Sequence, residues 1–331
     1  MEKTILLSQE QINSLITMED VLRAVDKTFV GFGDGTVINP TKVTLDLQGE
    51  IPNYTGYINA MPAYVGWADK AGIKWAGGWH EVRQAMGLPF ISSMILLINP
   101  KIGNYLAVMD GELITTLRTG AQAAVTTSYL RKDKNLTMGL FGCGAQGHMQ
   151  TKAFAGLFDI QTMYVYDLYK DAALRFKENM KDYVKGEIVV CDTPEEVCRP
   201  VPDVLVTFTH AKDKFLKNEW VKPGQIVFPM GSFTEVEDEL ILTADKIMVD
   251  HVGQCMHRGA LADVGMSGQL KESDLFATIG EVACGKKVVT NPEKERIICV
   301  PIGTGAMDIA VASIVYERAL EQGIGGEYRF V

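Results

Sequence analysis

The stretch that decides the fold is residues 136–157, LTMGLFGCGAQGHMQTKAFAGL. It opens with a short, mostly apolar run that predicts a buried strand. Gly142, Gly144 and Gly147 follow in the spacing G-x-G-x-x-G, and the remainder predicts a helix. In such a unit the first glycine makes the turn, the second lets a pyrophosphate approach the backbone, and the third lets the helix pack on the strand. The helix N-terminus adds free N–H groups and a positive dipole end for the phosphates.

A second apolar run, residues 163–166, ends at Asp167. Dinucleotide-binding domains hold the adenosine ribose with a carboxylate at this distance along the chain. A carboxylate there also repels a 2′-phosphate, and Leu168 and Tyr169 follow it, with Lys170 as the only nearby cation. The sequence therefore predicts NAD as the cofactor rather than NADP. The alternative is a turn without a ligand, since 32 glycines can produce the spacing by chance.

The composition is that of a globular protein, with 47% hydrophobic and 22% charged residues in a chain of 331. This length exceeds the usual size of one core, so two domains are expected. The net charge of −9 argues against a nucleic-acid surface, and no apolar run is long enough to span a bilayer. The N-terminus, MEKTILLSQEQ, has no signal-peptide pattern, and the six cysteines form no C-x-x-C pair. We therefore expect a cytoplasmic protein with reduced thiols.

The region before the glycine-rich unit is expected to hold mainly strands. Residues 8–33 predict a helix that Ser8 caps. Five runs then predict strands, namely KVTLDL, YTGYINAMPAYV, AGIKWAGGW, FISSMILLINP and YLAVMD. Gly103 and Asn104 are placed for a hairpin between the last two. Residues 113–131 predict one long helix that leads into the glycine-rich unit.

After this helix, strands and helices alternate, which predicts a parallel sheet. The strands are expected near residues 137–141, 163–166, 187–191, 204–208, 225–228, 246–249 and 297–300. The last helix, residues 308–321, comes after the dinucleotide domain should be complete. We therefore expect it to return to the first domain.

A series of short motifs runs the length of the chain. They are Met61-Pro62-Ala63, Gly72-Ile73-Lys74, Leu88-Pro89, AVMDGELITTLRTGA at 107–121, GCGAQG, and MGSF at 230–233. In this order they resemble the ornithine cyclodeaminase/μ-crystallin family. The most specific part is VMDGELITTLRTGA, followed closely by G-x-G-x-Q.

The resemblance implies an α/β fold with a Rossmann dinucleotide-binding domain, expected at residues 116–305. It also implies a discontinuous α/β domain for substrate binding and dimerisation, expected at residues 1–115 and 306–331. Family members are usually homodimers that use a nicotinamide cofactor on small amino or imino acids. Their activities include ornithine cyclodeamination, amino-acid dehydrogenation and imine reduction.

The predicted catalytic residues are Arg118 and Lys74. Arg118, in LRTGA, matches the family arginine that holds the substrate carboxylate, and a planar guanidinium suits that task. Lys74, in GIKW, matches a lysine that reaches the same carboxylate or polarises the reacting C–N centre. Lys42 and His80 are predicted as further substrate contacts. Lys42 stands where many members have arginine, and His80 follows Lys74 closely; ordinary surface roles are the alternative for both.

The predicted cofactor-binding residues come from the glycine-rich turn, the following strand ends and the resemblance. They are Thr119, Gly142, Gly144, Ala145, Gln146, Asp167, Thr209, Gly231, Ser232 and Asp308. No metal site is predicted, because His251, Cys255 and His257 lack a fourth ligand at a recognisable spacing. Cys143 is expected to be a small residue of the turn, with a reactive thiol as the alternative.

One departure from the family concerns the position of an acid. In the cyclodeaminases, a Gly-Gly-Asp motif supplies an aspartate that handles protons and water during deamination. Phe233 falls at that place here, and a phenyl ring cannot act as an acid or base. Glu235, Glu237 and Asp238 follow, and a solvated, acidic start of a helix is the expectation for them, with one of them replacing the missing acid as the alternative.

The sequence therefore predicts an NAD(P)-dependent oxidoreductase that moves hydride between nicotinamide and the α-carbon of an amino or imino acid. The first alternative is a cyclodeaminase of ornithine or a related diamino acid. The second is a non-catalytic NAD(P)H-binding protein, against which the retained Arg118 and Lys74 argue.

Overall fold

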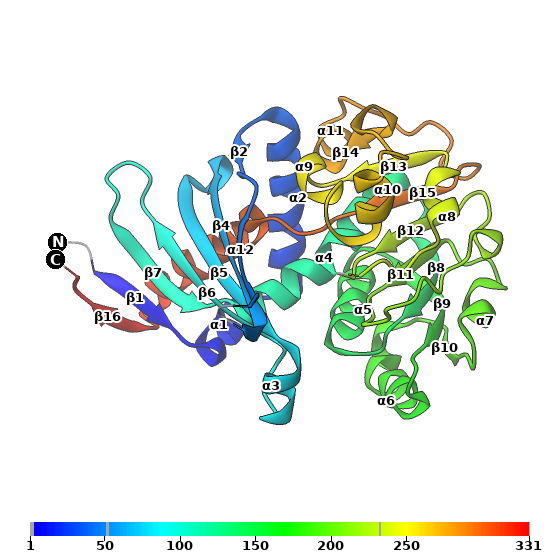
Figure 1. The fold of residues 1–331 in the computed structure, drawn as a ribbon. Coiled ribbons are helices and arrows are strands. Elements are labelled where there is room, and N and C mark those ends of the chain that lie inside the picture. Colours follow the sequence, from blue (N-terminus) through cyan, green and yellow to red (C-terminus); the bar gives the residue numbers. More distant parts are fainter. Residues whose placement is uncertain (1–2, 51–52, 232, 331) are drawn as a thin grey trace. The chain divides into compact units, whose positions relative to one another are not determined.

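The structure is a computed structural model that describes residues 3–50, 53–231 and 233–330 (Figure 1). The chain divides into two compact units, Met1–Arg118 with Thr304–Val331, and Thr119–Gly303. Each unit is built on an eight-stranded sheet with helices, so the predicted α/β class is confirmed. The unit boundaries lie close to the expected domain boundaries, at 118 against 115 and at 303 against 305.

The sheet of the first unit is mixed. Its order is β16-β1-β7-β6-β5-β4-β2, and β3 also pairs with β4. Among the strand pairs of the described residues, only β1 and β7 run parallel. The strands are β1 (Thr4–Leu7), β2 (Val37–Ile38), β3 (Val43–Gln48), β4 (Asn53–Val65), β5 (Lys70–Trp79), β6 (Ile91–Ile98), β7 (Tyr105–Asp110) and β16 (Gly326–Tyr328). The five predicted strands and the β6–β7 hairpin are confirmed, and the left-handed Gly103 (φ 76°) lies in its turn.

Helix α12 (Gly305–Gln322) covers one face of this sheet. It packs on β4, β5 and β6 and also against α2. The sheet residues that face it alternate along each strand, as Ile95 and Leu97 do in β6, and both are fully buried. The last helix thus packs within the first unit, where it was expected.

The predicted single helix at 8–33 is wrong, because the segment forms two helices. They are α1 (Gln9–Leu15) and α2 (Met18–Asp34). Ser8 caps α1 as predicted, but Thr17 starts α2 with a second capping box, in which Asp20 accepts from the Thr17 backbone. The apolar periodicity continues through the break, and the Thr-x-x-Asp pattern at the second helix start was overlooked. The remaining helical pieces of this unit are α3 (His80–Ala85) and the 3₁₀ turn η1 (Gly66–Ala68).

The opposite face of the same sheet carries exposed apolar side chains. Val43, Ala60, Trp75 and Met94 stand opposite one another across β3, β4, β5 and β6. Trp75 is 55% exposed and Met94 is 56% exposed. This row is therefore an apolar surface within the first unit.

The sheet of the second unit is entirely parallel, as the alternation of strands and helices predicts. Its order is β10-β9-β8-β11-β12-β15-β13-β14. The strands are β8 (Asn135–Phe141), β9 (Asp159–Tyr166), β10 (Glu187–Val190), β11 (Val204–Thr207), β12 (Ile226–Pro229), β13 (Lys246–Val249), β14 (Ala277–Thr278) and β15 (Ile297–Val300). The strand order reverses between β8 and β11, which creates the switch point at which such sheets bind ligands.

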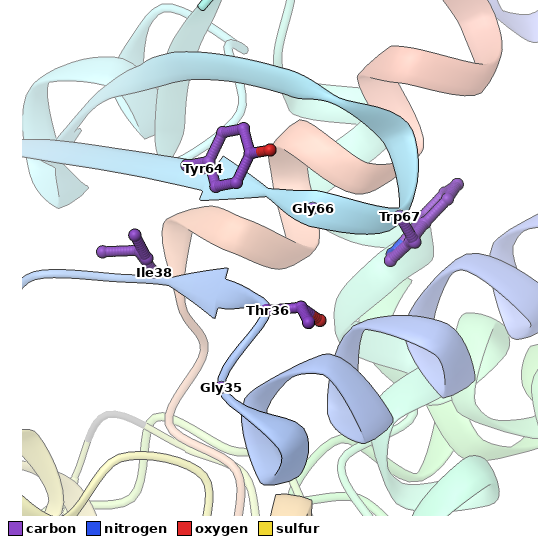
Figure 2. A pocket seen from close by; sticks show the side chains of 6 residues that line it. All are labelled: Gly35, Thr36, Ile38, Tyr64, Gly66 and Trp67. Carbon is purple, nitrogen blue, oxygen red and sulfur yellow. The ribbon is translucent and has the colours of Figure 1, made fainter.

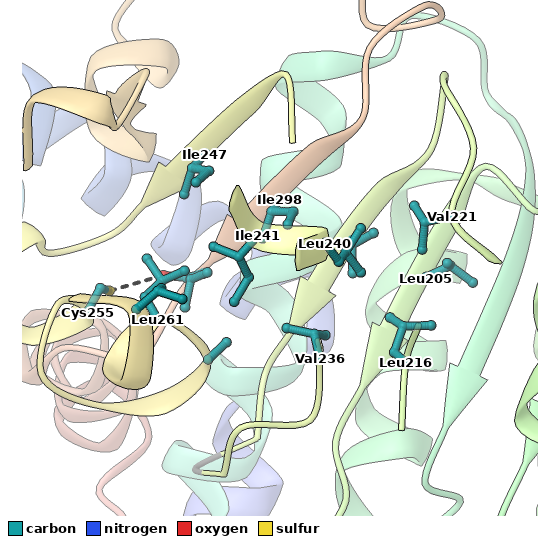
Figure 3. Close-up of a cluster of buried hydrophobic side chains, with 14 of the residues drawn as sticks. Leu205, Leu216, Val221, Val236, Leu240, Ile241, Ile247, Cys255, Leu261 and Ile298 are labelled. Atoms are coloured by element: carbon teal, nitrogen blue, oxygen red, sulfur yellow. Dashed lines mark hydrogen bonds between the residues drawn. The ribbon is translucent and has the colours of Figure 1, made fainter. Parts of the chain in front are cut away.

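Short helices connect these strands. Helix α4 (Glu112–Leu130) leads into β8, and its predicted extent is confirmed. The others are α5 (Ala145–Leu157), α6 (Lys170–Met180), α7 (Pro194–Cys198), α8 (Asp238–Leu242), α9 (Val252–Cys255), α10 (Ala262–Met266) and α11 (Ile279–Ala283), with 3₁₀ turns η2 (Lys181–Tyr183), η3 (Asn218–Trp220), η4 (Gly259–Leu261) and η5 (Glu272–Asp274). Figure 3 shows buried side chains of the core that joins these elements, with Leu205 of β11, Ile298 of β15 and Leu240 of α8 among them. This packing fixes the strand ends described below.

Across the described residues, every helix is too short or too polar to cross a membrane. All six cysteines are free thiols, and five of them are buried.

Candidate active site

Three ionised side chains meet inside the first unit. The Lys74 ammonium lies 2.8 Å from Asp308 Oδ2, and Arg118 donates from Nε to Asp308 Oδ1 over 3.0 Å. Asp308 is completely buried, and Lys74 and Arg118 are only 2% and 6% exposed. We call these three residues the ion cluster.

The fold explains how residues so distant in sequence converge. Lys74 lies in the middle of β5, where it pairs with Met61 of β4 and Ile95 of β6 on the buried face of the sheet. Asp308 lies in the first turn of α12, where the helix dipole favours a carboxylate. Arg118 projects from α4.

Thr115 joins the ion cluster, and the sequence analysis missed it. Its hydroxyl donates to Asp308 Oδ1 over 3.2 Å and lies 3.4 Å from the Lys74 ammonium. Thr115 precedes Arg118 by three residues, so the two share one face of α4. That spacing is the signal that could have found it.

The surroundings shift the pKa values of both Lys74 and Asp308. Burial, and then the charge of Arg118, lower the pKa of Lys74 to about 8 although Asp308 opposes this change. Burial alone would raise the pKa of Asp308, but the charges of Arg118 and Lys74 together lower it below its ordinary value. Lys74 can therefore take up or release a proton near neutral pH.

The charges of the ion cluster do not cancel. Counting these three residues alone, two cations face one carboxylate when Lys74 is protonated, in surroundings where a charge is poorly solvated. A carboxylate ligand would complete the charge balance. The structure thus brings together Lys74 and Arg118 as predicted, and it adds Asp308, which the sequence analysis assigned to the cofactor.

The glycine-rich turn lies at the carboxyl end of β8 in the second unit. Gly142 is left-handed (φ 101°), and a Cβ there would lie 2.4 Å from the Phe208 carbonyl oxygen. A Cβ at Gly147 would lie 2.4 Å from the Gly142 oxygen, whereas a Cβ at Gly144 would meet nothing within 4 Å. The first and third glycines are thus needed for packing, and the open space at Gly144 suits the approach of a ligand to the start of α5.

Asp167 follows β9 and points at this turn. Its Oδ2 accepts from the Cys143 N–H over 2.8 Å, and its Oδ1 accepts from the Tyr169 N–H over 2.9 Å. Each carboxylate oxygen can accept a second hydrogen bond, so ribose hydroxyls can bind to an acid that is already oriented. Lys170, the nearby cation, is paired with Asp192 over 2.5 Å.

Three predicted cofactor contacts lie in helix α5 or are hydrogen-bonded to it. Ala145 is the first residue of α5 and is exposed, Gln146 is half-buried beside it, and the Thr119 carbonyl accepts from Gln150 over 3.4 Å.

Cys143 is buried, and burial followed by the Asp167 charge raises the pKa of its thiol to about 12. The thiol is therefore protonated at neutral pH, which argues against the reactive-thiol alternative.

Thr209 and Gly231 lie past the ends of β11 and β12, at the same edge of the sheet. Both are hydrogen-bonded to Glu235, which is completely buried. The expectation that Glu235 belongs to a solvated acidic helix start is therefore wrong. Its carboxylate accepts four hydrogen bonds from residues of the second unit. Phe233 is 43% exposed and its ring lies edge-on to that of His210.

The two acids that follow are engaged outside this edge. Glu237 accepts from the Asn218 backbone N–H over 2.9 Å and precedes α8. Asp238 begins α8 and pairs with Lys214 over 2.6 Å. The predicted acidic helix start is thus confirmed for these two.

The remaining predicted site residues are Lys42, His80 and Ser232. Lys42 is half-buried directly before β3, and its contact with substrate stays a prediction. Ser232 and the side chain of His80 lie outside the described part of the structure.

The histidine and cysteine side chains considered for zinc have other partners. His251 caps α9 by accepting from the Gln254 N–H, and the Cys255 thiol lies 3.5 Å from Asp250. His257 lies 3.1 Å from the Gly253 carbonyl oxygen. In the described residues, no three His, Cys, Asp or Glu side chains come together as metal ligands would.

A separate hollow of about 520 Å³ lies in the first unit near the end of α2 (Figure 2). Its lining consists of Gly35, Thr36, Ile38, Tyr64, Gly66 and Trp67. None of these residues carries a charge at neutral pH, so the hollow lacks the groups that bind an amino acid.

Comparison with known proteins agrees with this geometry. The sequence profile of the ornithine cyclodeaminase/mu-crystallin family matches residues 2–323. The chain belongs to this family. Among the family's proteins, an alanine dehydrogenase of Archaeoglobus fulgidus is 34% identical over 331 residues, which cover 99% of both chains.

Solved structures of the family have the same fold. An archaeal alanine dehydrogenase dimer with bound NAD superposes with a TM-score of 0.91 at 34% identity, covering 99% of this chain and all of that one. The Δ1-pyrroline-2-carboxylate reductase of Thermococcus litoralis, in complex with NADH and L-proline, gives a TM-score of 0.89 at 27% identity, covering 98% and 99%. The predicted family and the predicted Rossmann class of the second unit are confirmed.

Proposed function

We propose that this protein is an NAD-dependent oxidoreductase that moves hydride between nicotinamide and the α-carbon of an amino or imino acid. Its relatives support this reading, because an alanine dehydrogenase and an imino-acid reductase match it over nearly the whole chain. The two structures named above were solved with NAD and with NADH.

The observation that carries the proposal is the ion cluster. Its two cations exceed its one carboxylate, so it favours a ligand that brings one carboxylate. The Arg118 guanidinium recognises the planar carboxylate, and Asp308 orients it through Nε. A protein that bound only the cofactor would not need this buried excess charge, and that consideration disfavours the non-catalytic alternative.

Lys74 is the proposed proton carrier. With a pKa near 8, its ammonium can donate a proton to the substrate nitrogen as an imine is reduced, and its neutral amine can accept one in the reverse direction. Thr115 and Asp308 hold its Nζ in place. Bound NAD(H) supplies the hydride chemistry, and the chain supplies orientation and charge.

The edge of the second unit fits a dinucleotide. The residues proposed to hold it are Gly142 and Gly144 at the phosphates and Asp167 at the adenosine ribose. The acid at Asp167 and the engagement of Lys170 by Asp192 favour NAD over NADP. Roles for Thr119, Ala145, Gln146 and Ser232 are proposed on the family resemblance alone.

A panel of substrates tests the proposal. The protein is incubated with NAD and single amino acids, and with NADH and keto acids plus ammonia or cyclic imino acids, while absorbance of the reduced cofactor is followed. We expect stoichiometric cofactor consumption with at least one imino acid. We expect little proline from L-ornithine with catalytic NAD, because Phe233 stands in the place of the acid. Rapid redox-neutral formation of proline would overturn this assignment in favour of the cyclodeaminase.

We also propose that the protein is a homodimer in the cytoplasm and that the first unit provides substrate binding and dimerisation. The apolar row of Val43, Ala60, Trp75 and Met94 supports a second copy as the occupant, since exposed apolar patches of this kind usually mark interfaces. The archaeal relative was solved as a dimer. Light scattering of the wild type and of Trp75→Glu tests this, with a dimer expected for the former and a monomer for the latter.

A further inference from the structure

Glu235 is a buried acid for which the proposed chemistry has no use. It lies in the segment between β12 and α8, and its side chain is completely inaccessible. Its backbone carbonyl accepts from the N–H groups of Phe215 and Leu216 over 3.0 and 3.1 Å. The residue is therefore anchored at both its backbone and its side chain.

The carboxylate of Glu235 joins the ends of two neighbouring strands. Oε1 accepts from the backbone N–H and the hydroxyl of Thr209, over 2.7 and 2.6 Å. Oε2 accepts from the Thr207 hydroxyl over 2.6 Å and from the Gly231 N–H over 3.1 Å. Thr207 ends β11 and Gly231 lies two residues past β12. One side chain therefore holds the backbone where it leaves each strand, and we call these two segments the strand exits.

Gly231 is adapted to this acid. A Cβ at this position would lie 2.4 Å from Oε2 of Glu235, so the carboxylate would have to move away from the backbone. The glycine therefore gives the carboxylate room to reach the backbone. Glu235 and Gly231 are therefore matched in this structure, because the short contact depends on the missing Cβ.

These strand exits lie on a defined half of the ligand-binding edge. The switch point falls between β8 and β11, and Asp167 follows β9 on one side of it. When the adenosine ribose binds at Asp167, the nicotinamide half of the dinucleotide lies across the switch point, over β11 and β12. The segment after β11 also contacts the glycine-rich turn, because Phe208 donates to the Phe141 carbonyl over 2.9 Å.

We propose that Glu235 is a positioning residue for the nicotinamide half of the dinucleotide: its carboxylate holds Thr209 and Gly231 in the arrangement that this half of the cofactor contacts. The inference rests on the proposed use of NAD(H). It assigns to Glu235 a role different from the acid missing at Phe233, since all its acceptor sites serve the strand exits.

The substitution Glu235→Gln tests this with almost no change of volume. An amide has one oxygen and one NH₂ group, whereas each carboxylate oxygen of Glu235 accepts from a backbone N–H. Whichever way the amide turns, its NH₂ group faces the backbone N–H of either Thr209 or Gly231. Two donors then meet, because a backbone N–H cannot accept a hydrogen bond. One strand exit must therefore shift.

The readout compares NADH with ADP-ribose, which lacks the nicotinamide. We expect Glu235→Gln to weaken NADH binding about tenfold, as loss of a hydrogen bond to a charged group does, and ADP-ribose binding less than twofold. Glu237→Gln is the matched control, because the Glu237 side chain accepts from the Asn218 backbone N–H, away from the strand exits, and a glutamine oxygen can accept the same bond. The control should bind both ligands as the wild type does.

Equal weakening of both ligands by Glu235→Gln would overturn the proposal, because it would indicate a general loss of structure. Unchanged NADH binding would overturn it too. If Glu235→Gln does not fold, Thr207→Val replaces it, since this removes one donor to Oε2 at a fully buried side chain at the end of β11. A selective loss of NADH affinity, about threefold, is then expected. Wild-type protein that binds ADP-ribose and NADH equally would refute the positioning role alone, whereas one that binds neither would refute the proposed function with it.

Discussion

Two buried carboxylates, one in each unit, are stabilised in opposite ways. Asp308 and Glu235 are both completely inaccessible to solvent. Asp308 faces Lys74 and Arg118, whose charges lower its pKa. Glu235 faces no cation among its hydrogen-bond partners, and burial raises its pKa although two threonines and a glycine N–H oppose this change.

The difference separates recognition from positioning. The ion cluster keeps an excess charge, so it can still attract a ligand. The hydrogen bonds of Glu235 are saturated by neutral donors of the chain itself, so this acid can only hold the backbone that surrounds it. A buried acid therefore indicates a ligand site only when its partners leave some charge or some donor unsatisfied.

The largest effect is expected when the acid of the ion cluster is neutralised. In Asp308→Asn, Lys74 and Arg118 face each other without an anion, and breaking such a buried pair costs about 3–5 kcal/mol of unfolding free energy. Glu235→Gln leaves no buried charge unpaired and should cost only about 1–3 kcal/mol. Urea unfolding of both variants measures this, and a smaller loss for Asp308→Asn than for Glu235→Gln would reverse the comparison.

The pH dependence of stability should carry the signature of Lys74. Its folded pKa of about 8 lies below the ordinary 10.5, so between these values the unfolded chain binds a proton that the folded chain has released. Stability therefore rises with pH across this window, by up to about 1.4 kcal/mol per pH unit, and below pH 8 the contribution of Lys74 stays at its least favourable level.

Lys74→Met removes this titration. The difference in unfolding free energy between the wild type and Lys74→Met should therefore change steadily between about pH 8 and 10.5 and stay constant from pH 8 down to neutral pH. Groups that do not contact Lys74 titrate equally in both proteins and cancel, and Asp308, whose pKa Lys74 lowers, titrates at acid pH outside this window. Parallel curves over the whole range would contradict the assigned pKa.

Arg118→Lys separates charge from geometry within the ion cluster. The charge balance with Asp308 survives, so stability should change little, but the planar fork for a substrate carboxylate is lost. We expect kcat/KM to fall at least about tenfold, as a lost hydrogen bond to a charged group implies. Normal steady-state kinetics in this variant would rule out the carboxylate anchor.

The smallest effect is expected at the adenosine end of the second unit. Asp167→Ser with Leu168→Arg removes the carboxylate that repels a 2′-phosphate and adds a cation that attracts one. The ratio of NADP(H) to NAD(H) affinity should rise about tenfold, which is the effect of one charge-assisted contact at an exposed edge. Tighter binding of NADPH than NADH by the wild type would show that this strand end has been misread.

Much of the second unit could be predicted because its signals are contiguous in sequence. Gly142, Gly144 and Gly147 fall within one turn, and Asp167 follows at the next strand, so local spacing fixes their relation. The same local reasoning failed at Thr17, where a continuous apolar periodicity hides a break between two helices.

The ion cluster could be predicted only in part. Lys74 and Arg118 were found through motifs of a family, but their common partner Asp308 lies 190 residues or more away along the chain and converges only through the sheet and α12. Glu235 was read as solvated because its neighbours Glu237 and Asp238 are acidic. Its burial depends on strand exits that no local pattern encodes.

The return of α12 to the first unit sets an order on synthesis. Residues 1–118 leave the ribosome before residues 119–303, yet the helix that covers β4, β5 and β6 lies at 305–322 and emerges after both. The second unit, 119–303, is continuous and can close while the first sheet still exposes the face that carries Ile95 and Leu97. The nascent first unit therefore presents two apolar faces until α12 has been synthesised, which is the interval in which its sheet is most exposed to aggregation.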